Sequence, residues 1–432
     1  MKLDVYGDTL CALVSAAALA STGNDVVLHV PDMPLLQALS AGECPFREPD
    51  LPELLLEQQQ EGRLVFVSVD QPPADDVSVV FISLAPSALP LANDIVRRFA
   101  ALPSRSWLLV NQSTFAVGTT DSFTAVFQQS LPEKSDARFV SVSLPDVLQE
   151  GAALQNFTRP AHFVLGCNNA AAEKLVKEVL RPFNRRRDGI LTMLPSEAEF
   201  TKLAINGMLA TRLSFMNEMA NLADVFGVDI EKVRQGLGAD GRIGDAYLYP
   251  GCGFGGLSFS RDLMSLVDTL ASSGVASGLL HQVLAINEHQ KEVLFRKLWQ
   301  HYDRRLENKT VTIWGAAFKP NTHRIENAPA LRLIDALLAQ GASLRIHDPQ
   351  AMPALAHQYM GNPNIEYFND EYDAAKGADA LMLVTEWKCY WQPDFIKLKS
   401  IMKTPLLLDG RNIYGPEYVR EHGFEYYGVG RG

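Results

Sequence analysis

The chain has 432 residues, too many for one ordinary core, so its length predicts two or three domains. Hydrophobic residues make up 47% and charged residues 21%, as in soluble globular proteins, while a net charge of −11 argues against a nucleic-acid partner. Five scattered cysteines without metal-ligand spacing predict a reduced, cytoplasmic compartment and no metal site, and no apolar run approaches the ~18 residues of a membrane span.

The N-terminal segment predicts a strand–helix–strand unit. Residues 2–7 form a short apolar strand that ends in glycine, residues 10–20 are small and apolar as in a buried helix, and residues 25–30 form the next strand. A strand, a turn, a helix and a second strand within about 30 residues are typical of a parallel α/β fold.

The turn of this unit departs from the dinucleotide-binding pattern. That pattern is G-x-G-x-x-G with an acid ending the second strand, because glycines admit the diphosphate and the acid binds the ribose. Here Gly7 is kept, Thr9 and Ala12 replace the other two glycines, and Val30 ends the second strand. Asp8 adds a negative charge at the turn. The residues alone therefore predict a βαβ unit with a poor dinucleotide site.

Later strands of the first half bring polar residues to the carboxyl edge of a sheet. Apolar runs typical of parallel strands occur at residues 64–66, 77–82, 107–110 and 139–142. Thr114 follows one such strand and predicts either a ligand contact or a solvated turn. Asp146 and Glu150 are four residues apart, so they would share one face of a helix and act as an acid–base pair, or simply be exposed.

A long apolar helix is predicted from about Glu197 to beyond Asn221. Ser196 and Glu199 have the spacing of a capping box at its start. Lys202 and Asn206 are one turn apart inside the apolar run, so their donors point to one side. They would serve as oxyanion donors, or the lysine would extend to solvent.

A glycine-rich loop follows at residues 251–256. Four glycines in six residues leave a backbone with few side-chain walls, and Ser258 and Asp262 come directly after it. This order predicts the floor of an active site with a potential nucleophile, while a tight packing turn is the alternative interpretation.

The last third predicts a second, smaller doubly wound domain. Apolar strands at residues 309–315, 344–349, 380–385 and 405–409 alternate with helical segments. The final strand leads into a turn that carries Arg411, a suitable position for a phosphate or a nucleotide.

Taken together, these segments resemble the UDP-glucose/GDP-mannose dehydrogenase family, and within it the UDP-glucose 6-dehydrogenases. The resemblance is carried by residues 45–55, 113–120, 197–221, 240–262, 315–322, 328–329, 385–387 and 409–414. It implies an α/β protein with two Rossmann-like doubly wound domains joined by a long central helix, assembled as a homodimer. The implied boundaries are 1–190 for the dinucleotide-binding type domain, 191–303 for the central helical domain with the active-site loop, and 304–432 for the UDP-sugar domain.

The implied reaction converts UDP-glucose to UDP-glucuronate in two NAD-dependent oxidations, a step of polysaccharide biosynthesis. In the family a cysteine attacks the intermediate aldehyde, and water opens the resulting thioester. By position, Lys202 and Asn206 match the oxyanion and sugar donors, and Asp262 matches the aspartate that assists water. Thr114 and Glu150 match residues that place water and cofactor.

The resemblance also assigns residues to the two ligands. Arg242 is expected to act across a dimer interface, and Asp146 stands where the family usually has glutamate. The residues expected around the UDP-sugar are Asp146, Lys202, Asn206, Arg242, Tyr247, Phe254, Gly255, Lys319 and Arg411. Those expected around NAD are Gly7, Thr9, Leu10, Val30, Thr114, Glu150, Arg261 and Glu326.

The departures from the family fall on the nucleophile and the cofactor side. Ser258 occupies the position of the cysteine, Arg261 replaces a lysine, and Glu326 stands where the family has a cofactor-binding arginine, in addition to the changes at Thr9 and Val30. The sequence thus predicts a UDP-glucose 6-dehydrogenase-like protein of impaired activity. The alternative is an inactive paralogue that binds UDP-sugars as a sensor or partner subunit, and a weaker third option is a one-step oxidation with another cofactor.

Overall fold

The computed structural model describes residues 1–431 except 75, 103–104, 134, 185–188, 273 and 276–277. The chain divides into two compact units, Met1–Ala204 and Ile205–Gly432. None of the helices in the described part of the chain has the length and apolar character needed to cross a membrane.

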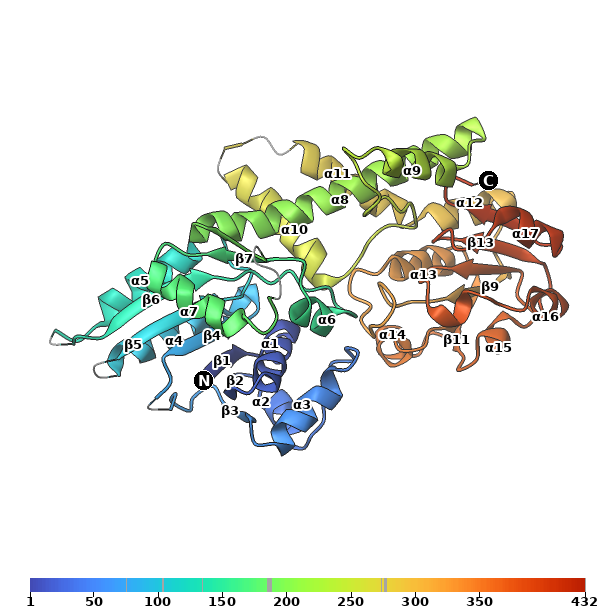
Figure 1. Ribbon diagram of the computed structural model, residues 1–432. Coiled ribbons are helices and arrows are strands. Elements are labelled where there is room, and N and C mark those ends of the chain that lie inside the picture. The colour runs from blue at the N-terminus through green and yellow to red at the C-terminus, as the bar shows by residue number, and fades with distance from the viewer. Residues whose placement is uncertain are drawn as a thin grey trace. The chain divides into compact units, whose positions relative to one another are not determined.

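The first unit is built on a twisted sheet (Figure 1) in which the described strands follow the order β3-β2-β1-β4-β5-β6-β7-β8. Neighbouring strands are parallel except β6 and β7, which pair antiparallel at Ser143 and Gly166. The strands are β1 (Lys2–Gly7), β2 (Asp25–Val30), β3 (Leu64–Ser68), β4 (Val79–Ser83), β5 (Ser106–Asn111), β6 (Arg138–Ser143), β7 (Phe163–Gly166) and β8 (Ile190–Met193). The strand order reverses direction between β1 and β4, the point at which open α/β sheets bind ligands.

Helices cover both faces of this sheet, which explains why its central strands are apolar on both sides. One core contains residues of α1, α3, α6 and α7, and the other contains residues of α4 and α5. The helices are α1 (Leu10–Ser21), α2 (Met33–Ser40), α3 (Leu51–Gln60), α4 (Leu89–Ala101), α5 (Thr119–Ser130), α6 (Ala153–Thr158) and α7 (Ala170–Leu180), with a 3-10 helix η1 (Pro86–Ala88) before α4. Because α1 is rich in alanine, it can lie close against the strands.

The second unit repeats this arrangement around a smaller parallel sheet with the order β11-β10-β9-β12-β13-β14 in the described residues. The strands are β9 (Thr310–Trp314), β10 (Ser343–His347), β11 (Ile365–Tyr367), β12 (Ala380–Leu383), β13 (Leu406–Asp409) and β14 (Glu425–Gly428). The helices that precede this sheet are α9 (Ile230–Ala239), α10 (Leu257–Ser272), α11 (Gly278–Gln290) and α12 (Val293–His301). Those within or after it are α13 (Pro329–Ala339), α14 (Met352–Gln358), α15 (Glu371–Ala375), η2 (Lys388–Tyr390), α16 (Phe395–Ile401) and α17 (Pro416–Glu421).

The long helix α8 (Pro195–Phe226) has 32 residues and runs along the top of the view in Figure 1. Two Rossmann-like sheets, the first parallel except at β6–β7, and a long central helix confirm the predicted fold class. The capping box predicted for Ser196 and Glu199 is wrong, because Glu197 instead accepts the backbone N–H of Leu194 over 2.7 Å.

Glu199 has a different, long-range role. Its buried carboxylate accepts the backbone N–H groups of Gly118 and Thr120, over 2.6 and 2.9 Å, at the start of α5. A carboxylate at a helix N-terminus satisfies free N–H donors and the positive end of the helix dipole. Glu199 therefore fixes the segment that connects Thr114 to α5.

Candidate active site

The glycine loop at residues 251–256 is held by side chains of α8 and α11. Asn217 accepts the backbone N–H of Gly251 over 2.8 Å, and Gln290 donates to the carbonyl of Gly251 over 2.8 Å. Asn287 both accepts from the N–H of Phe254 and donates to its carbonyl, over 2.8 and 3.0 Å. These contacts fix the backbone of the loop, as the floor of a binding site requires.

At two positions of the loop the geometry of the backbone requires glycine. Gly253 has φ +90°, a left-handed conformation that side chains disfavour. At Gly255 a Cβ would lie 2.4 Å from the carbonyl oxygen of Asn327, so no larger residue fits without moving backbone. The predicted alternative of a tight packing turn is therefore true in part, since the loop packs closely against the turn at residues 326–328.

The structure brings Asn206 and Asp262 together. Asn206 donates from its side-chain amide to the Asp262 carboxylate over 3.0 Å, and both side chains are buried. Ser258 is exposed and lies in the first turn of α10, one turn before Asp262, so the two share a helix face. Arg261, next to Asp262, has its Nε 3.9 Å from that carboxylate.

Lys202 and Asn206 both lie on α8, one turn apart, as the spacing predicted. In the first unit, Lys202 lies near the buried Cys11. Burial raises the pKa of the Cys11 thiol, the Asp146 carboxylate adds to the rise, and the Lys202 ammonium counteracts it. Asp146 and Lys202 are therefore each close enough to Cys11, in the first turn of α1, to influence its pKa.

Asp146 and Glu150 lie in a loop between β6 and α6, so the helical face proposed for them does not exist. Asp146 accepts the N–H of Leu148 over 2.8 Å. The loop is held from a distance by the buried carboxylate of Glu48, which accepts the N–H groups of Gly151 and Ala153, each over 2.6 Å. Glu48 therefore sets the backbone directly after Glu150.

The β1–α1 turn carries three of the residues assigned to the cofactor, Gly7, Thr9 and Leu10. Gly7 ends β1, where a Cβ would lie 2.0 Å from the carbonyl oxygen of Ser83, so this glycine is required by strand packing alone. Thr9 caps α1 and Leu10 begins it, while Val30 is fully buried at the end of β2. Thr114 follows β5 and is half-buried. Arg261 and Glu326 belong to the second unit.

On the nucleotide side, Arg411 lies against the glycine loop. Its guanidinium donates to the carbonyl of Val384 over 2.7 Å and to that of Gly253 over 3.4 Å, and it pairs with Glu386 over 3.2 Å. Lys319 is half-buried, with its Nζ 5.4 Å from the centre of the Phe318 ring. Arg411 therefore lies at the edge of the proposed sugar-binding floor.

The segment before the loop contains Arg242 and Tyr247. Arg242 is 89% exposed and its guanidinium binds the two carboxylate oxygens of Asp240 over 3.0 and 2.6 Å. Tyr247 has φ +58°, an unusual conformation for an aromatic residue, and burial raises its pKa. Strained backbone of this kind is concentrated at functional sites.

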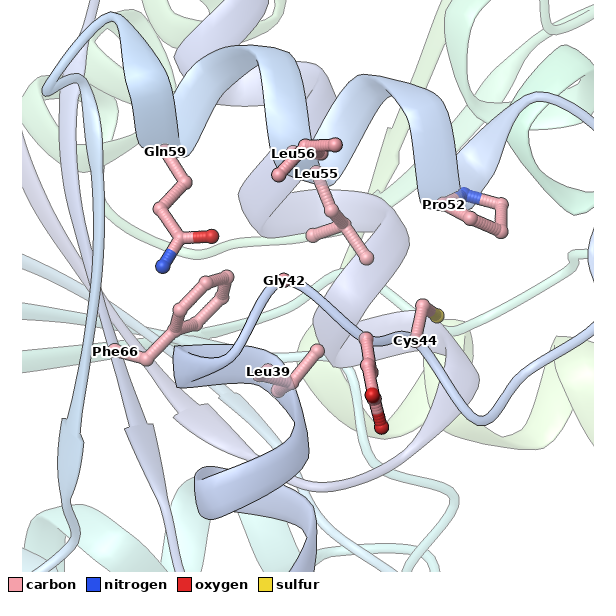
Figure 2. A pocket seen from close by; sticks show the side chains of 9 residues that line it. Leu39, Gly42, Cys44, Pro52, Leu55, Leu56, Gln59 and Phe66 are labelled. Atoms are coloured by element: carbon pink, nitrogen blue, oxygen red, sulfur yellow. The ribbon is translucent and has the colours of Figure 1, made fainter.

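A small hollow elsewhere in the first unit takes no part in this arrangement. Figure 2 shows it between α2 and α3, with Leu39, Leu55 and Phe66 among its lining residues. None of the residues assigned to sugar or cofactor lines it.

Three consecutive segments match the UDP-glucose/GDP-mannose dehydrogenase family: its NAD binding domain at residues 1–184, its central domain at 196–289 and its UDP binding domain at 312–416. The chain belongs to this family. It is therefore an oxidoreductase-family protein of the nucleotide-sugar dehydrogenase type, similar to UDP-glucose 6-dehydrogenases.

The similarity to individual relatives extends over almost the whole length of both chains. The chain is 39% identical to the UDP-glucose 6-dehydrogenase of Pseudomonas aeruginosa, covering 100% of this chain and 98% of the relative. It is 33% identical to UDP-glucose 6-dehydrogenase TuaD of Bacillus subtilis, covering 100% and 93%. A solved UDP-glucose dehydrogenase from Pyrobaculum islandicum matches with a TM-score of 0.87 at 27% identity, covering 100% and 98%.

Membership in the family implies NAD as the cofactor. The β1–α1 turn does not fit the diphosphate of a dinucleotide in the usual way. The side chain of Thr9 accepts the Ala12 N–H, one of the N–H groups at the start of α1 that have no partner within the helix. Val30 offers no hydrogen bond to a ribose, and Asp32, two residues later, accepts the Leu35 N–H of α2.

Proposed function

We propose that the protein is a UDP-glucose 6-dehydrogenase-like protein in which the step beyond the aldehyde is impaired. The observation that carries this proposal is the exposed Ser258, which stands at the position of the family's cysteine in the first turn of α10. A cysteine is partly thiolate at neutral pH, whereas a serine hydroxyl needs a positioned base to become a nucleophile. Asp262, on the same helix face, is buried and already accepts a hydrogen bond from Asn206.

The remaining assignments rest on the resemblance to the family, position by position. We assign the sugar to the glycine loop, with Phe254 and Gly255 beneath it and Lys202 and Asn206 as donors to its reacting oxygen. Asp262 would place water. The other proposed contacts are Asp146, Arg242, Tyr247, Lys319 and Arg411 for the UDP-sugar and Thr114 and Glu150 for water and cofactor.

The proposed chemistry separates two steps. Conversion of the alcohol to the aldehyde needs no enzyme nucleophile. Conversion of the aldehyde to the acid passes in the family through a covalent adduct with the thiol, and with Ser258 it must pass through the hydrated aldehyde. Stabilisation of the oxyanion by Lys202 and Asn206 would still favour hydration, so the second step becomes slow rather than forbidden.

A homodimer is part of the proposal and is supported by α8. Met208, Phe215 and Leu222 are exposed at intervals of seven residues along α8, and Val225 and Phe226 extend the same apolar surface. A sustained seven-residue spacing of apolar residues is the spacing of helix–helix contacts between chains. Light scattering after size-exclusion chromatography measures the mass, and Phe215→Asp is expected to yield monomers.

A second candidate is a protein that binds UDP-sugars without turnover. It is favoured by the β1–α1 turn, where Thr9 and Asp8 oppose a diphosphate. The two candidates predict different products when the protein is incubated with UDP-glucose and NAD.

The deciding experiment follows NADH during incubation with UDP-glucose and NAD and identifies the sugar product by mass spectrometry. One NADH per UDP-glucose with accumulated aldehyde supports the impaired enzyme. Two NADH formed at a rate that Ser258→Cys does not increase would contradict it. No NADH, together with a thermal shift on adding UDP-glucose, favours the binding protein. Ser258→Cys alone is not expected to restore full two-step turnover, because the cofactor side is altered as well.

A further inference from the structure

The N-terminus of α1 is closed by its own cap. The Thr9 hydroxyl accepts the Ala12 N–H over 3.2 Å and donates to the carbonyl of Ser83 over 3.0 Å. Thr9 therefore ties the first turn of α1 to the end of β4. In nucleotide-binding α/β folds, these free N–H groups and the helix dipole hold the diphosphate. In this chain the side chain of Thr9, between α1 and β4, occupies the position of the diphosphate.

Two carboxylates add to this closure. Asp8, half-buried in the same turn, has its pKa raised by burial, and the Asp32 carboxylate raises it further. Asp32 caps α2 by accepting the Leu35 N–H over 3.0 Å. The two acids therefore lie close enough to interact at the carboxyl ends of β1 and β2. A diphosphate placed here would meet like charge on both sides.

We propose that Thr9 and Asp8 close the diphosphate position of the NAD-binding domain, so that this chain holds NAD weakly and their replacement restores tighter binding. Thr9 acts by occupying the N–H donor, and Asp8 acts by charge. The proposal concerns cofactor binding alone, so it does not depend on whether Ser258 limits turnover.

The test is a binding measurement. The double variant Asp8→Asn/Thr9→Gly and the wild-type protein are titrated with NAD by calorimetry and with NADH by fluorescence. We expect the double variant to bind both at least about tenfold more tightly, since one repulsive charge and one competing acceptor are removed. Adenosine, which lacks the diphosphate, should bind both proteins equally.

Matched substitutions control for charge and for helix capping. Asp25→Asn removes an exposed carboxylate at the start of β2, and Thr22→Gly removes a threonine that donates to the Leu19 carbonyl at the other end of α1. Neither is expected to change NAD affinity. Equal gains in the controls, an equal gain for adenosine, or unchanged NAD affinity in the folded double variant would overturn the proposal.

The single variant Asp8→Asn tests the proposal if the double variant does not fold. Asp8→Asn keeps the Thr9 cap and is expected to tighten NAD binding about threefold, an effect that falls as salt is raised. An unchanged affinity in this variant, with its melting temperature at or above that of the wild type, would count against the charge part of the proposal. UDP binding, measured alongside, shows whether a failure lies in the cofactor site or in the nucleotide-sugar function.

Discussion

Asn206 donates a hydrogen bond to Asp262 over 3.0 Å, and this contact joins α8 to α10 at a buried point. Removing the amide with Asn206→Ala takes a donor from a buried carboxylate. Hydrogen bonds to charged groups contribute about 1.5–3 kcal/mol, so we expect the free energy of unfolding to fall by that amount. Urea denaturation measures it.

The control for this prediction lies on the same helix. Asn221 donates to the neutral side chain of Gln290 over 3.0 Å in a partly buried position. Asn221→Ala should cost about 1 kcal/mol, as for a neutral pair. If Asn221→Ala lowers the free energy of unfolding as much as Asn206→Ala or more, the charge of Asp262 adds nothing to the strength of its hydrogen bond.

Gly255 is expected to tolerate no side chain. In Gly255→Ala the added Cβ would lie 2.4 Å from the backbone oxygen of Asn327, so the loop or the facing turn must shift. We expect a loss of about 1–3 kcal/mol in stability and at least about tenfold weaker UDP-glucose binding, measured by calorimetry. Gly241→Ala is the matched control, because a Cβ there meets nothing within 4 Å. If the two variants lose similar amounts of stability and UDP-glucose affinity, the steric clash at Gly255 is not the cause.

Much of this arrangement was predictable from local sequence. Strands covered on both faces appear as continuous apolar runs, and the spacing of Lys202 and Asn206 inside a helix fixes their common side. Asp146 and Glu150 have the same spacing, but their backbone is a loop whose shape depends on Glu48, about 100 residues away. A carboxylate that caps a distant segment leaves no periodic trace in the sequence.

A contact between residues far apart in sequence also explains why the capping box predicted for Glu199 is wrong. Its spacing from Ser196 matches a capping box, but its carboxylate is buried against the start of α5 instead. Local propensity yields to a tertiary contact that satisfies two backbone donors. The proximity of the glycine loop to Asp262 was easier to predict, because the two are close together in sequence.

Asp8 makes stability depend on pH. Burial raises its pKa above the ordinary value of 3.8, so the folded protein holds this proton more tightly than the unfolded chain. Stability therefore falls as the pH rises through the window between that value and the raised pKa. Asp8→Asn should stabilise the protein at pH ~7 by less than about 1 kcal/mol, because the group is only half-buried.

The gain from Asp8→Asn should shrink as the pH is lowered below the raised pKa and disappear well below 3.8, where the wild-type carboxyl is neutral in both states. Thermal unfolding of both proteins across this range checks the trend. The exposed Asp25 supplies the control variant, Asp25→Asn. A gain that is constant with pH would mean that Asp8 acts through packing and not through its charge.

Asp4 and His29 form a buried pair on neighbouring strands. His29 Nε2 lies 3.0 Å from the Asp4 carboxylate, both side chains are at most 1% exposed, and the Tyr6 ring stacks on His29 with centroids 4.1 Å apart. Removing one member of a buried pair leaves a polar group without its partner and costs about 3–5 kcal/mol. We expect that loss for His29→Leu in urea denaturation.

Replacing both members should cost less. In Asp4→Val/His29→Leu no carboxylate remains to be desolvated, so the double variant should be more stable than His29→Leu alone, and the double-mutant cycle gives the coupling. The stacking of Tyr6 is lost in both variants and cancels in their comparison. If the double variant is the less stable of the two, the cost in His29→Leu comes from lost packing around the ring, and the Asp4–His29 contact contributes little to the sheet.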